Sequence, residues 1–297
     1  MGRHYHSCDN LSKGTLVGAG RSLYREGMIP IADTVRYVLF PHYISRRTVM
    51  DGASAGHLLV LLFITICLGI VVSGLVGGVI TIIMGEIPEN VNGTLAETDA
   101  RRLIILGVLI APLMEELIFR SWLGFPRSSV LGFPAMICVL VLLAMWGLGT
   151  GAALFLPVAM GLGLLIFLLV QRYGRLSAAE QAVARHRLFP VAFWGTILTF
   201  GVIHLSNYEG GMAGALANPI LFLAIVPQII AGAVLGYVRM RFGLMQAIFF
   251  HMVYNAVLIS LALLAVNQTP PAEAFLLMSE NQAFSRVPLL QTAGPLP

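Results

Sequence analysis

Charged residues are scarce in this chain of 297 residues. Asp, Glu, Lys and Arg make up 11% of it, whereas hydrophobic residues make up 58% and the mean hydropathy is +0.86. Soluble domains contain about 25% charged residues. The shortage excludes an ordinary water-soluble globule and indicates that long stretches of the chain face lipid.

Cysteine is also rare, with Cys8, Cys67 and Cys138 alone. Two of the three lie in apolar segments, which makes a disulfide framework a poor explanation and favours packing roles. The first thirty residues lack the apolar stretch of a secretory signal, so we expect no cleaved signal peptide. The net charge of +4 does not indicate nucleic-acid binding, because the arginines stand between apolar runs, where they set topology.

Seven apolar runs predict an all-α, polytopic membrane protein. The runs cover residues 57–84, 103–124, 130–145, 152–170, 189–206, 219–238 and 244–266. A basic leader (1–56) precedes the transmembrane domain (57–266), and a proline-containing tail (267–297) follows it. Within this domain, the runs at 130–145 and 152–170 are joined by a Gly-rich turn and are expected to form a helical hairpin.

The distribution of Lys and Arg predicts the orientation in the membrane. Most of them fall in the leader, near residue 127, in the 171–188 loop and between the last two runs, which all lie on one side. Cytoplasmic segments collect basic residues. We therefore expect a cytoplasmic N-terminus, and the odd number of spans then places the C-terminus outside.

The second apolar run contains three ionisable residues in the sequence APLMEELIFRSW. Each charge at the centre of a bilayer costs about 2.5–3.5 kcal/mol on insertion scales. Glu116 and Arg120 are four residues apart, so an ion pair can offset part of this cost. Glu115 has no such partner, and about 14 Å of helix separates it from Gly124 near the end of the run. A structural role for the two glutamates is the alternative to a chemical one.

Two later runs carry polar residues at helical spacing. In TFGVIHLSN, Phe200 and His204 share one helix face, and in AIFFHMVYNAV, His251 and Asn255 do the same. A lone membrane histidine is more often a packing residue than a catalyst. Polar groups on three helices would, however, each stay unsatisfied in lipid unless they met in one cavity. We therefore expect them to converge with the glutamate pair.

A buried glutamate, two histidines and an asparagine can hydrolyse a peptide bond. The glutamate would act as general base on a water molecule, while histidine and asparagine donors would stabilise the oxyanion. The same groups could instead hold Zn²⁺ through Glu115, His204 and His251, with bound water as the nucleophile. The chain has no H-E-x-x-H motif, the best local signature of such a zinc site. Both alternatives stay open.

The motifs E-E-x-x-x-R, F-x-x-x-H and H-x-x-x-N, in this order and each on an apolar run, resemble those of the CPBP family. This family contains the type II CAAX prenyl endopeptidases and the Abi-like bacteriocin-processing proteins. The likeness covers residues 103–266 and implies a catalytic core over this range, with an inserted helical hairpin at 130–170. It implies a membrane peptidase that acts on a peptide or protein substrate reached from the bilayer, with prenylated proteins as the namesake substrates.

The resemblance also implies residue roles. Glu115 would be the general base, with Glu116, Arg120 and Phe200 in support. His204 would position or activate the water. The oxyanion would be bound by the residues of the third motif, His251 and Asn255. A divalent metal such as Zn²⁺ is compatible with the family, and so is a metal-free glutamate mechanism.

Two alternatives to a peptidase follow from the residues. A catalytically inactive scaffold of the same fold would keep the helices and lose the chemistry, yet all motif residues are present. A proton-coupled transporter would use buried Glu and His in a relay, but it would need further polar groups on other spans and inverted-repeat symmetry.

The sequence departs from the usual family spacing because the hairpin at 130–170 separates Glu116 from His204.

Overall fold

The computed structural model describes residues 31–44, 48, 50–85, 100–124, 128–147, 151–208 and 210–268. The regular elements in these ranges are helices, which confirms the predicted all-α class. Most of the leader, the acidic loop near residue 90 and nearly all of the predicted tail lie outside the described residues.

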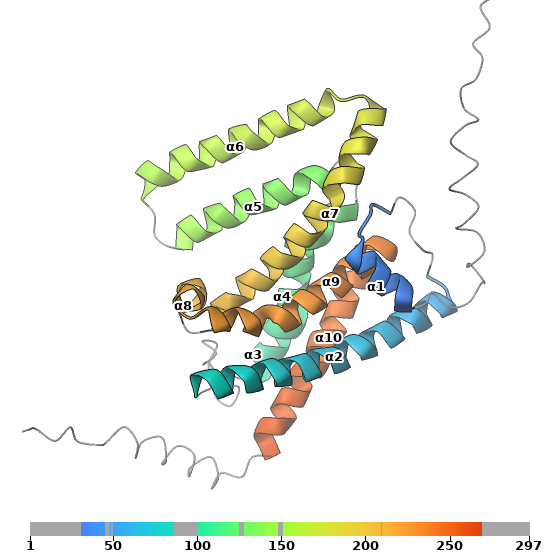
Figure 1. Ribbon diagram of the computed structural model, residues 1–297, viewed down its shortest axis with the longest axis vertical. Helices are drawn as coiled ribbons and strands as arrows, with labels where there is room; N and C mark the ends of the chain where they lie inside the picture. The colour runs from blue at the N-terminus through green and yellow to red at the C-terminus, as the bar shows by residue number, and fades with distance from the viewer. Residues whose placement is uncertain are drawn as a thin grey trace, which may run out of the picture.

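Each of the seven predicted runs coincides with a helix (Figure 1). Five stretches are long and apolar enough to cross a membrane: Gly52–Met84, Ala153–Gly174, Ala178–Asn207, Pro219–Arg241 and Leu244–Leu264. A shorter apolar helix covers Val130–Met145. The chain is thus a multi-pass membrane protein, and the count of seven spans stays a prediction. The main helices are α2 (Gly52–Met84), α5 (Ser128–Gly147), α6 (Ala152–Gly174), α7 (Ala178–Ile203), α9 (Val226–Arg241) and α10 (Leu244–Gln268).

Local signals in the sequence set several helix ends. The Asp51 carboxylate accepts a hydrogen bond from the Ser54 backbone N–H at the start of α2, and this bond lowers the pKa of the Asp51 carboxyl. Ser177 and Glu180 form a reciprocal capping box at the start of α7. Gly85, with a φ of 81°, ends α2 in the left-handed conformation that glycine adopts readily.

The second predicted run is a continuous but irregular helix from Ala100 to Gly124. The α-helical pieces α3 (Ala100–Leu103) and α4 (Ala111–Glu115) alternate with two π-helical segments, η1 (Ile104–Ile110) and η2 (Glu116–Arg120), and the helix ends in the 3-10 turn η3 (Ser121–Gly124). Such π-helical turns are rare and occur often at functional sites. We call the whole segment the glutamate helix.

Helix α9 lies at the centre of the bundle, between α7, α2 and α10 (Figure 1). Glycines allow the close approaches: a Cβ at Gly236 would come within 2.8 Å of the Phe193 ring on α7, and a Cβ at Gly69 of α2 would come within 2.6 Å of the Tyr254 hydroxyl on α10. The small-residue spacing in the apolar runs therefore serves helix packing.

The predicted inserted hairpin is α5 followed by α6. A Cβ at Gly132 of α5 would come within 2.3 Å of the Trp122 side chain on the glutamate helix, and Phe133 lies against Gly195 of α7. Helix α6 packs beside α5 at the outer edge of the bundle (Figure 1). None of the most apolar window of α6 is buried in the protein, so this helix faces lipid.

The end of the predicted leader is part of the packed structure. Helix α1 (Ile31–Leu39) buries Tyr37, whose ring makes edge contacts with Phe193 of α7 and Tyr237 of α9. Three exposed apolar residues, Ile31, Val35 and Leu39, form a stripe along this helix. Residues 31–39 therefore belong to the helical bundle, although composition alone grouped them with a polar leader.

The segments predicted to lie on one side of the membrane meet at one end of the bundle. The Tyr43 hydroxyl donates to the Gly124 carbonyl, three residues before Arg127, and the Arg185 guanidinium lies over the Tyr43 ring. The Thr48 backbone N–H donates to the carbonyl of Arg241. The same end of the bundle therefore contains the end of the leader, the end of the glutamate helix, the first turns of α7 and the end of α9. The distribution of Lys and Arg predicts this arrangement.

The contact between Gly132 and Trp122 predicts a stability effect. We expect Gly132→Ala to lower the free energy of unfolding by about 1–3 kcal/mol, because the added methyl overlaps the indole ring in a packed interface. Thermal unfolding of purified protein in detergent measures this loss. Gly161→Ala on α6 is the matched control, because a Cβ there meets nothing within 4 Å. Equal melting temperatures for the two variants would contradict the packing assignment.

Candidate active site

The predicted ion pair on the glutamate helix is present and completely buried. The Arg120 Nη1 donates to Glu116 Oε1 at 2.5 Å, and both side chains have 0% exposure. Glu116 Oε2 and Arg120 Nε and Nη2 have no hydrogen-bond partner among the described residues. Buried polar atoms without partners are unusual in folded proteins, so this pair is a candidate functional centre.

His251 of α10 lies between the two adjacent carboxylates. Its Nδ1 is 3.0 Å from Glu116 Oε1, and its Nε2 is 3.6 Å from Glu115 Oε2. The Glu115 side chain is 25% exposed, whereas that of Glu116 is fully buried. Because Glu116 already accepts from Arg120 and can only accept when ionised, Nδ1 carries the hydrogen that it donates to Glu116.

The Phe200 ring lies close to residues from all three motifs. The guanidinium carbon of Arg120 is 4.4 Å from the centre of this ring, a cation–π contact. The ring centres of His204 and His251 are 4.7 Å and 6.2 Å from that of Phe200. Gly232 of α9 makes room for this group, since a Cβ there would come within 3.1 Å of the Phe200 ring.

His204 stands at the end of α7, where the helix changes to the 3-10 turn η4 (His204–Asn207). Its Nδ1 is 2.7 Å from the Phe200 carbonyl oxygen and donates to it. In a neutral ring this bond leaves the lone pair on Nε2. His204 therefore has one nitrogen held by its own helix and the other available as an acceptor.

Asn255 lies one turn after His251 on α10 and contacts the glutamate helix. Its Nδ2 donates to the Gly107 carbonyl at 2.9 Å. An amide nitrogen carries two hydrogens, so this bond leaves a second donor on the same atom. The structure thus brings Glu115, Glu116, Arg120, His251 and Phe200 into direct contact, and it connects His204 to them through the Phe200 ring.

Arg239 is a buried residue that the sequence reasoning assigned only to membrane topology. It lies near the end of α9 with 1% exposure, and it donates from Nε to the Arg120 carbonyl at 2.9 Å and from Nη2 to the Ser121 carbonyl at 2.7 Å. These carbonyls are at the end of the glutamate helix, where intrahelical donors run out. Arg239 thus caps that helix from a neighbour. Its position beside Arg241 gave no sequence signal for this role.

The residues do not gather into a metal site in the part of the chain that the structure describes. No group of three His, Cys, Asp or Glu side chains there could hold a metal ion. Glu115, His204 and His251 do not form such a group, and the use of a metal by these residues stays a prediction.

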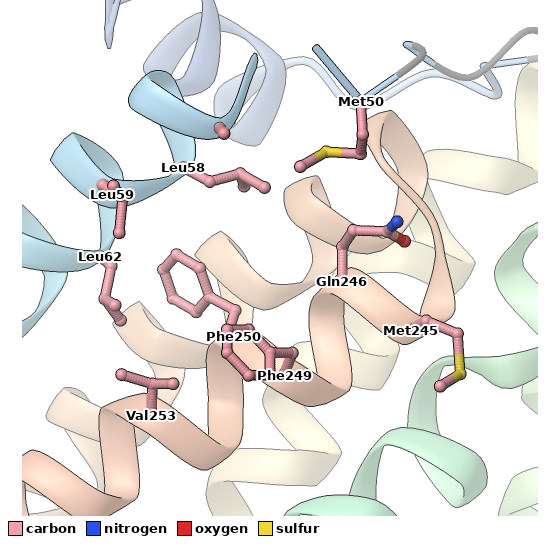
Figure 2. A pocket seen from close by; sticks show the side chains of 10 residues that line it. Met50, Leu58, Leu59, Leu62, Met245, Gln246, Phe249, Phe250 and Val253 are labelled. Carbon is pink, nitrogen blue, oxygen red and sulfur yellow. The ribbon is translucent and has the colours of Figure 1, made fainter. Parts of the chain in front are cut away.

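An apolar cavity of about 470 Å³ lies between α2 and α10 (Figure 2). Leucines of α2, including Leu58 and Leu62, line one side, and Phe249, Phe250 and Val253 of α10 line the other, with the Gln246 amide among them. Helix α10 therefore presents His251 to the glutamates and its neighbouring residues to this cavity.

The buried ion pair predicts opposite effects for a single and a double substitution. Glu116→Gln should lower the free energy of unfolding by about 3–5 kcal/mol, because it leaves the buried Arg120 cation unpaired. The pair Glu116→Met with Arg120→Met removes both charges and should regain most of this stability. Thermal unfolding in detergent tests both. A double variant no more stable than the single one would show that the pair is not the source of the loss.

A model of the Rce1-like type II CAAX prenyl endopeptidase family matches residues 99–257, which include every motif residue named above. No curated protein and no solved structure gave a significant match. The matched region covers more than half of the chain and contains the glutamate helix, the hairpin and all residues of α7 and α9. The chain therefore belongs to the Rce1-like family of type II CAAX prenyl endopeptidases, which are peptidases of the membrane.

Proposed function

We propose that this protein is an intramembrane endopeptidase in which Glu115 acts as general base on the attacking water. The observation that carries the proposal is the contrast between the two glutamates around His251. Glu116 is fully buried and neutralised by Arg120, whereas Glu115 is partly exposed and has no arginine partner in the described chain. Glu115 is therefore the carboxylate that can reach water and accept a proton from it.

In the proposed reaction the water oxygen attacks the carbonyl carbon of the scissile peptide bond. One proton of the water passes to the Glu115 carboxylate as the new C–O bond forms. Glu115 then returns this proton to the leaving nitrogen, which departs as an amine when the C–N bond breaks. The water supplies the oxygen of the new carboxyl group, so no other reactant is required.

His204 is proposed to orient the attacking water. Its Nδ1 hydrogen is donated to the Phe200 carbonyl, which leaves Nε2 as an acceptor in the neutral ring. An acceptor at this position can hold a water hydrogen and aim the oxygen lone pair at the substrate. In this role the His204 imidazole is neutral and does not have to bind a metal ion.

The third motif is proposed to supply the oxyanion donors. Asn255 keeps one amide hydrogen after it binds the Gly107 carbonyl, and His251 in its doubly protonated form presents an Nε2–H donor on the side of Glu115. Donors fixed before the reaction stabilise a developing oxyanion without further reorganisation. Glu116 and Arg120 support this arrangement, because Glu116 holds the His251 ring by its Nδ1.

Substitution of Glu115 tests the peptidase against the scaffold. Glu115→Gln should reduce cleavage by about 10²–10⁴-fold, the usual contribution of a general base, and leave the folded protein intact. The measurement compares C-terminal peptides in membranes that carry wild type with those that carry the variant. Glu180→Gln is the matched control, because Glu180 is an exposed capping residue at the start of α7.

Three results are informative in this comparison. Peptides that require Glu115 but not Glu180 support the peptidase and supply its substrates. Identical peptide profiles for a folded Glu115→Gln variant and wild type would favour the inactive scaffold. Loss of peptides in both variants would show that the effect is not specific to the carboxylate.

We propose further that the substrate is prenylated and that the cavity between α2 and α10 receives its apolar chain. Apolar lining on both sides, with one amide, suits an amphiphile with an uncharged hydrocarbon tail. The position supports the proposal because helix α10, whose Phe250 and Val253 line the cavity (Figure 2), also carries His251.

Filling the cavity tests this substrate assignment. Val253→Trp should raise KM for a prenylated peptide by about tenfold or more, since the loss of a few buried methylenes corresponds to that factor. The same variant should cleave a peptide without the prenyl group at the wild-type rate. Leu261→Trp, at an exposed position further along α10, is the control. Equal effects on both peptides would place the hydrocarbon chain elsewhere.

A further inference from the structure

In the interior of the glutamate helix, the backbone carbonyl of Gly107 lacks a donor within the helix. In the π-helical segment η1, each N–H bonds to the carbonyl five residues earlier, as the Ala111 N–H does with the Leu106 carbonyl. The next carbonyl in this series belongs to Gly107, and the next nitrogen belongs to Pro112. Proline has no N–H, so the series stops and the Gly107 oxygen loses its intrahelical donor.

Asn255 supplies the missing donor from α10. Its Nδ2 lies 2.9 Å from the Gly107 oxygen. A carbonyl left without a partner inside the bilayer is costly, so this bond satisfies both the backbone group and the side chain. The carbonyl that proline leaves unpaired is therefore the one that the amide of the third motif binds.

Glycine at position 107 allows the two helices to approach closely enough for this bond. A Cβ at Gly107 would come within 2.8 Å of the Ile259 Cδ1, one turn beyond Asn255 on α10. A larger residue would push α10 away or force Ile259 to shift. Gly107 and Pro112 thus both favour the hydrogen bond from Asn255 to the Gly107 carbonyl. Gly107 leaves space for α10, and Pro112 lacks the N–H that would otherwise bind this carbonyl.

We infer that Pro112 is a positioning residue for catalysis, which acts through the Gly107 carbonyl to hold the Asn255 amide. The inference rests on the proposed function, in which Asn255 binds the oxyanion with its second hydrogen. One amide hydrogen is bound to the backbone, and this bond fixes the plane of the amide and the direction of the other hydrogen. Pro112 itself touches neither substrate nor the reacting atoms.

The substitution Pro112→Ala separates positioning from folding. Alanine restores an N–H that can bind the Gly107 carbonyl, so Asn255 loses its exclusive partner. We expect kcat to fall about tenfold with KM unchanged, because the oxyanion donor is misaligned rather than removed. The melting temperature should stay the same or rise, since alanine favours a helix more than proline does.

Pro157→Ala on the lipid-facing helix α6 is the matched control. It makes the same change in the interior of a membrane helix and should leave kcat at the wild-type value. A Pro112→Ala variant with wild-type kcat would overturn the inference. So would a variant in which kcat and melting temperature fall together, because that result indicates a role in folding alone.

A spectroscopic measurement tests the positioning without the peptidase activity. In protein labelled with ¹⁵N-asparagine, the side-chain amide signal of Asn255 is identified by its loss in Asn255→Gln. This signal should shift and exchange faster with solvent in Pro112→Ala but not in Pro157→Ala. An unchanged signal would overturn the inference. If wild type shows no cleavage that depends on Glu115, the proposed function fails, and the amide signal still decides whether Pro112 holds Asn255.

Discussion

The buried charges of the glutamate helix constrain the rest of the bundle. Glu116 and Arg120 are both inaccessible to solvent, and a charge in this environment is costly unless it is paired and hydrogen-bonded. The pair therefore needs neighbours that satisfy or screen it, and it obtains them from two other helices: His251 bonds to the carboxylate and the Phe200 ring covers the guanidinium. The convergence of the three motifs follows from this electrostatic requirement.

The irregular backbone of the glutamate helix is the second feature that shapes this site. The glutamate helix alternates between α-helical and π-helical turns and ends in a 3-10 turn, and neighbouring helices bind carbonyls that it leaves without an intrahelical donor. Asn255 bonds to the Gly107 carbonyl within the helix, and Arg239 bonds to the Arg120 and Ser121 carbonyls at its end. In lipid, water cannot fill these positions, so side chains from α9 and α10 must do so. The position of Glu115 between these two anchors is thereby fixed.

Spacing within one helix was sufficient to predict several parts of the site. The interval of four residues from Glu116 to Arg120 predicted their ion pair, which the structure contains. Arg239 could not be found in this way, because an arginine near the end of an apolar run has the same pattern whether it faces headgroups or turns inward. Helix α1 was missed for a similar reason: its charged residues resemble a leader, while its packing depends on the Tyr37 contacts with α7 and α9.

The sequence by itself determined that the chain lies in lipid, that it is helical and which residues form the three motifs. Hydropathy and helical periodicity suffice for this because they are local properties of the chain. Only the tertiary structure decided which partners those motif residues have. It placed His251 against both glutamates, gave Asn255 a backbone carbonyl as its partner and brought the Phe200 ring close to both histidine rings. These contacts join residues more than a hundred positions apart or on different helices, and no local spacing encodes the tilt and register by which two helices meet.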